Sequence, residues 1–254
     1  MSDNNIANDR YSRNNLFINP DQQEKIKNAK ILFGGVGLGS VIAETALRLG
    51  FENFVFLDAD EVEISNLNRQ NYTLEDVGKP KVDAITQRLQ AINPDVKIEY
   101  HQVFLDEGNM NSFVDESVSV AVNALDYDTT APFTFDNACL EYGVPIIHPG
   151  NLSWGAMTFV ITHDSMKLDE VLKSSEVDTV LSFLWSQIQE QHSHLNLDWF
   201  KDIPQKVKSN PQLPLPQMSV GANLVAGQAV TIMCNILDSV AIKTFPKIYF
   251  LSTL

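Results

Sequence analysis

The sequence predicts an α/β protein with a Rossmann-like, mostly parallel sheet, helices on both faces and antiparallel strands near the C-terminus. Three observations support this fold class. From residue 30 onward, short and nearly continuous apolar segments alternate with amphipathic ones, which is typical of buried parallel strands and their covering helices. A glycine-rich turn follows the first apolar segment. Beyond residue 153, alternation of apolar and polar residues replaces the continuous runs, as in an antiparallel or edge strand.

The first elements form a βαβ unit. Residues 29–33 (AKILF) predict a short buried strand, residues 38–49 a helix, and residues 53–60 (NFVFLDAD) a second strand that ends in acids. The next expected elements continue the alternation: a helix near 79–92, strands at 96–103 and 117–125, a helix near 131–142 and a strand at 144–150.

The pattern changes in the last hundred residues. The elements expected there are an antiparallel or edge strand at 154–163, a polar helical region at 168–195, a proline-rich surface loop at 209–219, an apolar core helix at 221–241 and a last strand at 247–254. We see no internal repeat or low-complexity tail. The sequence therefore predicts one domain over residues 1–254, with an irregular insertion at about 164–218.

Composition and charge limit the function. The chain has 254 residues, 44% of them hydrophobic and 20% charged, which is ordinary for a soluble protein. Apolar runs such as SVAVNAL are shorter than the about 20 residues that span a bilayer, and MSDNNIANDR lacks the regions of a signal peptide, so we expect a cytoplasmic protein with no membrane partner. A net charge of −14 argues against nucleic-acid binding, so an anionic ligand must meet locally concentrated Lys and Arg.

The two cysteines, Cys139 and Cys234, cannot form a disulfide framework or a four-cysteine zinc site. Both lie in apolar, helix-like segments and are expected to be buried packing residues. Two histidines close together, His192 and His194, are interpreted as solvated surface residues rather than metal ligands. His148 follows an apolar strand, where it either lines a substrate pocket or caps the strand.

The turn GGVGLGS, residues 34–40, stands between a strand and a helix, so free N–H groups of the helix can face a phosphate. Asp58 ends the second strand, where dinucleotide-binding proteins place a carboxylate that binds ribose hydroxyls. These features predict nucleotide binding, and the alternative is a tight structural turn. Val36 rarely tolerates a positive φ, so any left-handed residue must be Gly35 or Gly37.

Polar residues follow the ends of two further strands. In DADEVEISNLNRQ (residues 58–70), Asn66, Arg69 and Gln70 lie beyond a strand's carboxyl end, where parallel sheets bind ligands. A lysine at a helix N-terminus opposes the helix dipole, so Lys81 and Lys79 of GKPK favour an anionic partner. The alternative is a solvated surface charge, and it is stronger for Lys79.

The fourth strand ends at Asp126 of NALD. A carboxylate among phosphate-binding cations is a natural Mg²⁺ ligand, with Asp128 as the alternative residue.

Taken together, RYSR (residues 10–13), the glycine loop, DADEVEISNLNRQ, GKPK, and NALD before a helix and VPII resemble the ThiF/MoeB family of adenylating enzymes, relatives of the ubiquitin-activating enzymes. The resemblance covers residues 9 to about 162, and residues 221–233 are similar to the family's late core helix. It implies activation of a C-terminal carboxylate, of a small ubiquitin-like or sulfur-carrier protein or a peptide, by transfer of AMP from ATP and release of pyrophosphate.

The resemblance also implies roles for residues at matching positions. Asp58 would hold the ribose, Asp126 would bind Mg²⁺, and Arg13 would reach across a homodimer interface to the partner's ATP. The implied nucleotide-binding residues are Gly34, Gly37, Gly39, Asp58, Asn66, Arg69, Gln70 and Lys81. The residues implied for catalysis are Arg69, Lys81, Asp126 and Arg13.

Several features depart from the family pattern. Val36 replaces a family glycine, and Ala131 and Pro132 stand near the place of an arginine in the helix after the aspartate. No paired CxxC motifs occur and the 164–218 insertion has no cysteine, so we expect no structural zinc and no thioester formation on this chain. Two other functions are weighed: an NAD-dependent oxidoreductase, which would use the glycine loop and Asp58 but not the cations, and a catalytically silent dimeric scaffold.

Overall fold

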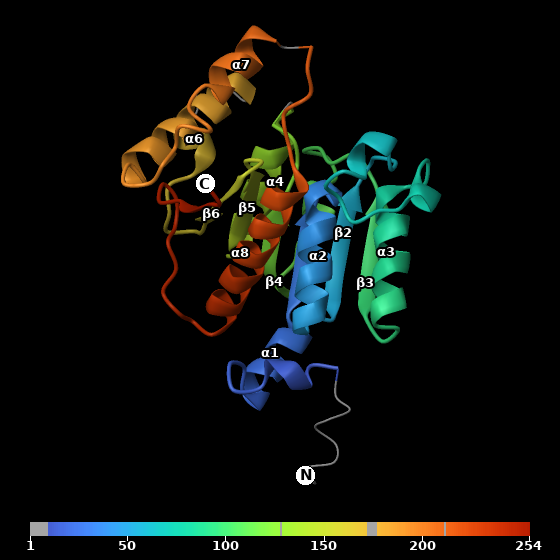
Figure 1. Cartoon of the computed structure of the whole chain (residues 1–254). Helices are drawn as coiled ribbons and strands as arrows, with labels where there is room; N and C mark the ends of the chain where they lie inside the picture. Colours follow the sequence, from blue (N-terminus) through green and yellow to red (C-terminus); the bar gives the residue numbers. More distant parts are fainter. Residues whose placement is uncertain (1–9, 128, 172–176, 211) are drawn as a thin grey trace.

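The computed structural model describes residues 10–127, 129–171, 177–210 and 212–254, and within them seven strands form one sheet (Figure 1). The sheet order is β3-β2-β1-β4-β5-β6-β7. The first five of these strands are mutually parallel, whereas β6 and β7 are antiparallel to their neighbours. The strands are β1 (Lys30–Gly34), β2 (Asn53–Asp58), β3 (Lys97–Gln102), β4 (Val118–Asn123), β5 (Ile146–Asn151), β6 (Gly155–Ile161) and β7 (Tyr249–Ser252).

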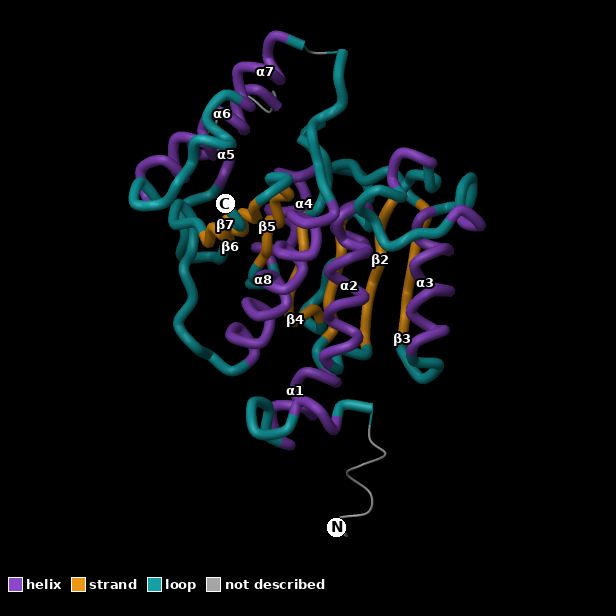
Figure 2. The backbone as a smooth tube through the Cα atoms, viewed as in Figure 1, coloured by secondary structure: helices purple, strands orange, loops and turns teal. Residues whose placement is uncertain are grey.

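Helices cover both faces of this sheet (Figure 2). The described helices are α1 (Pro20–Asn28), α2 (Gly37–Leu49), α3 (Lys81–Ile92), α4 (Ala131–Glu141), α5 (Leu168–Val171), α6 (Val177–Gln191), α7 (Ile203–Ser209) and α8 (Ser219–Leu237). Apolar side chains of α2, α3 and α8 pack on one face, and those of α4 and α6 pack on the other. The predicted fold class is therefore confirmed.

The predicted elements are found with small shifts at their ends, but three details differ. One is α7 (Ile203–Ser209), a helix between the predicted helical region 168–195 and the predicted loop 209–219. β6 is buried along its whole length between β5 and β7, so it is antiparallel as predicted but is not the edge strand. The sequence pattern does not predict α1, a polar helix in which only Ile26 is buried. This helix is specified by its start, where the Asn19 side chain accepts a hydrogen bond from Gln22 N and proline occupies the first helical position.

Of the helices in the described ranges, α8 is the one long and apolar enough to cross a membrane by length and composition, contrary to the expectation that no segment reaches that length. In the structure α8 packs against α2, β5 and β6. Val225, Ala229 and Met233 on its inner face are fully buried. It is the core helix that the sequence predicts.

The segment before α1 is fixed at the end of the sheet where β2 begins. The Tyr11 hydroxyl donates a 2.8 Å hydrogen bond to Glu52, and Asn14 Nδ2 donates one of 2.8 Å to Leu49 O. Burial, reinforced by Glu52, raises the pKa of Tyr11 to about 12. Arg13 lies between these two anchors, on a short 3₁₀ helix (η2, Ser12–Asn14), and is exposed.

Glu44 joins α2, α3 and the polar segment after β2. It is 7% exposed and pairs with Arg48 and Arg88, and it accepts a 2.8 Å hydrogen bond from Asn71 Nδ2. Burial by itself raises the pKa of Glu44, but the hydrogen bonds from Arg88 and Arg48 outweigh this effect and the pKa is lowered overall. The cluster therefore stabilises the folded state while Glu44 is ionised.

We expect Glu44→Gln to lower the free energy of unfolding by about 1 kcal/mol near neutral pH, because both arginine partners are partly exposed. The pKa of Glu44 is lower in the folded state, so the effect should be complete above the unfolded value of 4.5 and shrink as the pH falls below it. Urea unfolding at about pH 7 and about pH 3.5 measures this difference. The exposed Glu75→Gln serves as control, and a penalty that grows on acidification would contradict the assignment.

Candidate adenylation site

The carboxyl ends of β1, β2 and β4 meet at one edge of the sheet. Gly34 at the end of β1 is in register with Leu57 of β2 and with Asn123 of β4. The glycine loop, Asp58 and the NALD segment therefore leave the sheet side by side, as the sequence predicts.

The turn of the glycine loop is made by Gly35. Its φ is +86°, and a Cβ at this position would lie 2.6 Å from the carbonyl oxygen of Ala124. Val36 has an ordinary φ of −113°, is fully buried and caps α2. The steric prediction is thus confirmed: Val36 does not distort the loop, because the left-handed position falls on Gly35.

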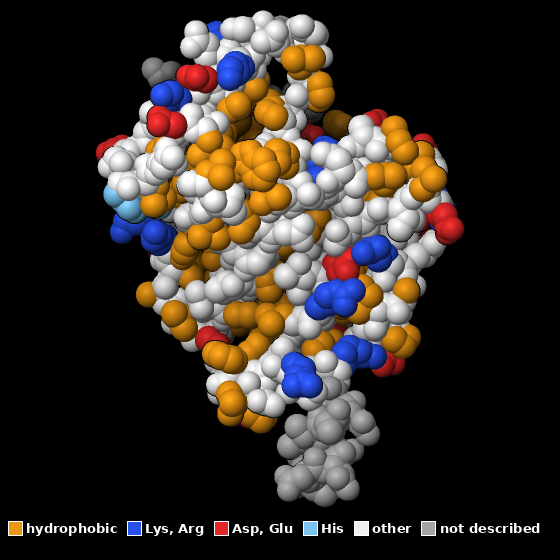
Figure 3. Space-filling view, in the orientation of Figure 1, with side chains coloured by type: hydrophobic (Ala, Val, Ile, Leu, Met, Phe, Trp, Pro, Cys, Tyr) orange, Lys and Arg blue, Asp and Glu red, His pale blue; other side chains and the backbone are white. Residues whose placement is uncertain are grey.

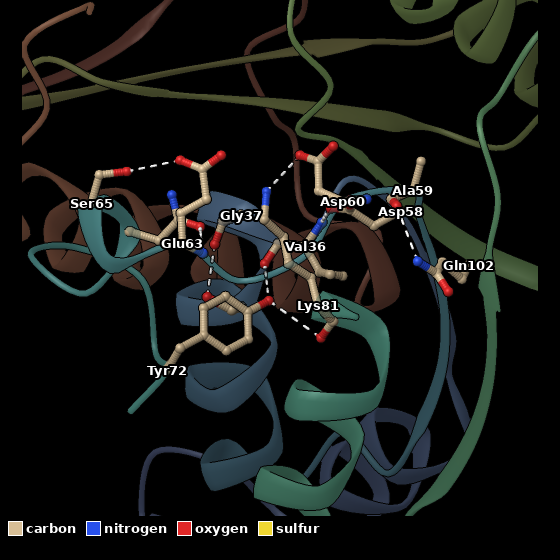
Figure 4. Close-up of polar contacts among 12 residues, drawn as sticks. Val36, Gly37, Asp58, Ala59, Asp60, Glu63, Ser65, Tyr72, Lys81 and Gln102 are labelled. Carbon is tan, nitrogen blue, oxygen red and sulfur yellow. Dashed lines mark hydrogen bonds and ion pairs between the residues drawn. The ribbon is translucent and has the colours of Figure 1, made fainter. Parts of the chain in front are cut away.

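Asp58 and Tyr72 hold Val36 from both sides (Figure 4). Asp58 Oδ2 accepts a 2.7 Å hydrogen bond from Val36 N, and the Tyr72 hydroxyl donates one of 2.7 Å to Val36 O. The other Asp58 oxygen accepts a hydrogen bond from Asp60 N. Burial raises the pKa of Asp58 and nearby Lys81 opposes this rise. Asp58 therefore fixes the loop, and its contact with a ribose stays a prediction.

Lys81 begins α3 and is 8% exposed. Its Nζ lies 2.7 Å from Oδ2 of Asp60, whose side chain is 65% exposed (Figure 4). Asp60, which sequence reasoning did not single out, thus gives Lys81 an anionic partner within the chain, and phosphate binding by Lys81 stays a prediction. Lys79 pairs at 3.2 Å with Asp76 and is 43% exposed, so its interpretation as a surface charge is confirmed.

Arg69 extends toward the segment after β4. Its guanidinium donates hydrogen bonds to Ser65 O and to Oε1 of Gln217, a residue near the end of the proline-rich loop. Burial lowers the pKa of Arg69, and the charge of Asp126 raises it again, so Arg69 and Asp126 are close enough to interact. Asp126 is exposed. Asp128 lies outside the described residues.

The other predicted residues serve packing or local structure. Asn66 is buried and its Oδ1 accepts a hydrogen bond from Glu63 N, which caps a 3₁₀ helix (η3, Ile64–Asn66). Gly34 faces the ring of Phe135 and Gly39 faces Phe33, so both allow close packing.

Two features of this edge fit a bound nucleotide. Gln70 Oε1 is buried and has no hydrogen-bond partner among the described residues. A Cβ on Gly37 would meet Nε2 of Gln70 at 3.1 Å, so glycine makes room for the Gln70 side chain beside the start of α2. Lys81 and Arg69 supply positive charge at the same edge. Phosphates would pair with the two cations, whereas the Gln70 oxygen is an acceptor and would need a donor, such as a hydroxyl or amino group of a nucleotide.

The metal predictions rest on Asp126. Within the described ranges no three His, Cys, Asp or Glu side chains converge, so Mg²⁺ would need phosphate oxygens beside this one carboxylate. The absence of structural zinc stays a prediction.

The remaining cysteine and histidine interpretations have mixed outcomes. Cys139 is fully buried as expected, whereas Cys234 is only partly buried. His194 is exposed as predicted, but His192 Nε2 lies 3.2 Å from Ile248 O and is half-buried. His148 is 2% exposed in the middle of β5, so it neither caps a strand nor lines an open pocket.

Comparison with known proteins identifies the family. A family model described as "ThiF family" matches residues 11–252. The chain belongs to the ThiF family. This finding confirms the resemblance seen in the sequence motifs.

Several curated relatives are similar in sequence to part of this ThiF-family chain. It is 33% identical over 139 residues to the tRNA threonylcarbamoyladenosine dehydratase of Bacillus subtilis, covering 54% of each protein. It is 32% identical over 162 residues to the sulfur carrier protein adenylyltransferase of Thermus thermophilus, covering 62% of this chain and 59% of the relative. The sulfur carrier protein ThiS adenylyltransferase of B. subtilis is 35% identical over 162 residues, covering 61% and 48%. The matched chain spans about half of these curated relatives.

Solved structures share the fold. Escherichia coli MccB with ATP superposes with a TM-score of 0.70 at 18% identity, covering 97% of this chain and 72% of MccB. A structure of PaaA gives a TM-score of 0.70 at 22% identity, covering 100% of this chain and 81% of PaaA.

Proposed function

We propose that this protein is an ATP- and Mg²⁺-dependent adenylyltransferase. Its substrate is the C-terminal carboxylate of a small ubiquitin-like or sulfur-carrier protein or of a peptide, which it converts to an acyl adenylate with release of pyrophosphate. The observation that supports this most is the meeting of the glycine loop, Asp58 and the NALD segment at one sheet edge, with the cations Lys81 and Arg69 beside them. Two curated relatives are named as sulfur-carrier adenylyltransferases.

The side chains at this edge suit attack of a carboxylate on the α-phosphorus. A new bond forms between a carboxylate oxygen and phosphorus, the bond from that phosphorus to the bridging oxygen breaks, and pyrophosphate takes the electron pair. The attacking carboxylate is already ionised at neutral pH, so no general base is needed. Lys81, Arg69 and the N–H groups at the start of α2 reduce the repulsion between the two anions and stabilise the leaving group. Bound Mg²⁺ would supply further positive charge, with Asp126 as its protein ligand.

A protein or peptide substrate fits this chain better than RNA does. One relative is named for a modified nucleoside of tRNA. This chain carries a net charge of −14, which repels a polyanion and leaves only local cations for an anionic ligand. A flexible C-terminal tail brings a single carboxylate and avoids that repulsion.

Exchange of labelled pyrophosphate into ATP tests this function. We expect exchange only when a carboxylate substrate is added, so the assay should compare small carrier proteins ending in Gly-Gly with short peptides. The matched control is each peptide with an amidated C-terminus, which removes the attacking carboxylate. Equal exchange with free and amidated peptides, or no exchange with any carboxylate, would refute the proposal.

We also propose that Arg13 completes the site of a second copy. Tyr11 and Asn14 fix the segment at the amino end of β2, whereas the nucleotide residues follow the carboxyl end (Figure 1). The six residues of β2 span about 20 Å, which is farther than an arginine side chain extends. Arg13 is therefore out of reach of its own site.

A second copy has an uncharged surface available. The sequence of α8 contains no charged residue, and Figure 3 shows mostly apolar and uncharged side chains across the face over this helix. Leu16 and Phe17, close to Arg13, are 98% and 91% exposed. Such apolar exposure is typical of an interface between copies.

Complementation distinguishes an arginine supplied in trans from one supplied in cis. Arg13→Ala and Lys81→Met should each be inactive alone. The two variants are co-expressed with different tags, and heterodimers are purified through both tags. If Arg13 acts in trans, the site of the Arg13→Ala copy has its own Lys81 and receives Arg13 from the Lys81→Met copy. We therefore expect about half of the wild-type exchange rate. Heterodimers with no activity would contradict the trans arrangement.

No thioester step is proposed for this chain. Burial raises the pKa of the Cys139 thiol well above its usual value, and Asp136 adds to this effect. Burial, together with Asp238, raises the pKa of Cys234 to about 11. Neither thiol is a ready nucleophile at neutral pH, because the thiolate is the reactive form.

A further inference from the structure

A polar cluster lies beside the segment that carries Asp126. Its innermost members, Asn123, Asp136 and His148, are 4%, 6% and 2% exposed. The Tyr127 hydroxyl lies 3.0 Å from Nδ1 of His148. The imidazole ring stacks on Phe159 with 4.5 Å between ring centroids, so its orientation is fixed by packing.

The cluster fixes the chain on both sides of Asp126. Before it, Asn123 Nδ2 donates hydrogen bonds of 2.8 Å to Asp136 Oδ1 and to Pro132 O, both on α4. After it, Tyr127 is held by His148 on β5. The position of an exposed carboxylate is thus set by the buried Asn123, three residues before it, and by the partly buried Tyr127, one residue after it.

Within the cluster, the contact between His148 and Tyr127 is the one that holds the chain after Asp126. Nε2 of His148 lies 3.0 Å from Asp136 Oδ1, but it has no regular hydrogen bond to any described residue. The regular contact of the ring is therefore through Nδ1. Loss of the Tyr127 hydroxyl would leave the ring in place and release only the segment.

We propose that Tyr127 and His148 are positioning residues that hold Asp126 beyond the carboxyl end of β4, in the place where it can bind the metal of Mg-ATP. This inference rests on the proposed adenylyltransferase function, in which Asp126 is the metal ligand. Groups that orient a metal ligand through hydrogen bonds affect metal affinity strongly, although they do not touch the metal.

The test compares Tyr127→Phe with Tyr142→Phe, a control that removes a hydroxyl from a residue 46% exposed at the end of α4. We expect Tyr127→Phe to weaken Mg-ATP binding by about tenfold in calorimetry and to speed hydrogen exchange at amides 124–127, with little change in Tm. His148→Asn places an amide near the position of Nδ1, so it should bind Mg-ATP more tightly than His148→Gln. The control should behave as wild type.

A double-mutant cycle with Asp126→Asn tests whether Tyr127 affects Mg-ATP binding through Asp126. If Tyr127 acts through Asp126, Tyr127→Phe should cause little further loss in the Asp126→Asn background. Additive losses, or unchanged hydrogen exchange in Tyr127→Phe, would overturn the inference. If the wild-type protein does not bind Mg-ATP, the proposed function fails, and so does the role of Tyr127 and His148 in metal binding. Hydrogen exchange would still show whether the contact between Tyr127 and His148 holds the segment in place.

Discussion

A Lys81→Met enzyme should exchange pyrophosphate into ATP about 10² to 10³ times more slowly than wild type, a loss of roughly 2.7–4 kcal/mol of transition-state stabilisation. Lys81 is 8% exposed at the first position of α3. Its charge therefore acts where water screens it little, and the positive end of the helix dipole adds to it. Methionine keeps the length and apolar stem of the side chain, so the variant removes the charge with little change in packing.

Lys79→Met is the matched control for this variant. Lys79 lies two residues earlier, is 43% exposed and pairs with Asp76, so its loss should change exchange by less than about twofold. Asp60→Asn removes the partner that holds Lys81 and should leave exchange intact. If Lys81→Met has the wild-type Tm and exchanges within about threefold of wild type, Lys81 does not stabilise the transition state.

The second large effect is expected at Gly35. Gly35→Ala should lower the free energy of unfolding by roughly 2–5 kcal/mol, the sum of about 1–2 kcal/mol for a side chain at φ +86° and about 1–3 kcal/mol for the clash with Ala124 O. The variant should also lose pyrophosphate exchange, because relief of the clash moves the loop away from the start of α2. Urea unfolding and the exchange assay measure the two losses.

The variant Gly78→Ala distinguishes backbone strain from the clash with Ala124. The φ of Gly78 is +83°, almost that of Gly35, but an added Cβ meets no described atom within 4 Å. Gly78→Ala should therefore show only the cost of backbone strain and should retain exchange. Equal losses of stability in the two variants would mean that the contact with Ala124 has no role in shaping the loop.

The sheet could be predicted because buried parallel strands are apolar on both faces, as in residues 29–33 and 117–125. The same reasoning does not predict α1, because Ile26 is the one residue of this helix that is buried. The capping residues Asn19 and Gln22 specify the start of the helix instead. Short polar helices lack the periodic apolar stripe on which pattern reading depends.

In the candidate site, too, some features could be predicted from the sequence and others could not. The turn at Gly35 could be predicted because Val36 is excluded from positive φ by sterics alone. The contact of Arg69 with Gln217 joins residues 148 positions apart, and no local pattern indicates it. The pairing of Lys81 with Asp60 joins the start of α3 to the loop after β2, 21 residues earlier, so no local pattern indicates it either.

The contact between Gln217 and Arg69 also bears on the proposed association of two copies of the chain. Gln217 lies two residues before α8, and Asn68 Nδ2 donates a further hydrogen bond to its carbonyl oxygen. Phosphates that draw Arg69 away from Gln217 would remove one of the contacts that fix the start of α8, whose uncharged face is the surface proposed for a second copy. Thermodynamic linkage then makes the effect reciprocal. If bound nucleotide changes the association constant between copies by some factor, association changes the affinity for nucleotide by the same factor. Nucleotide affinity measured at different protein concentrations should differ accordingly.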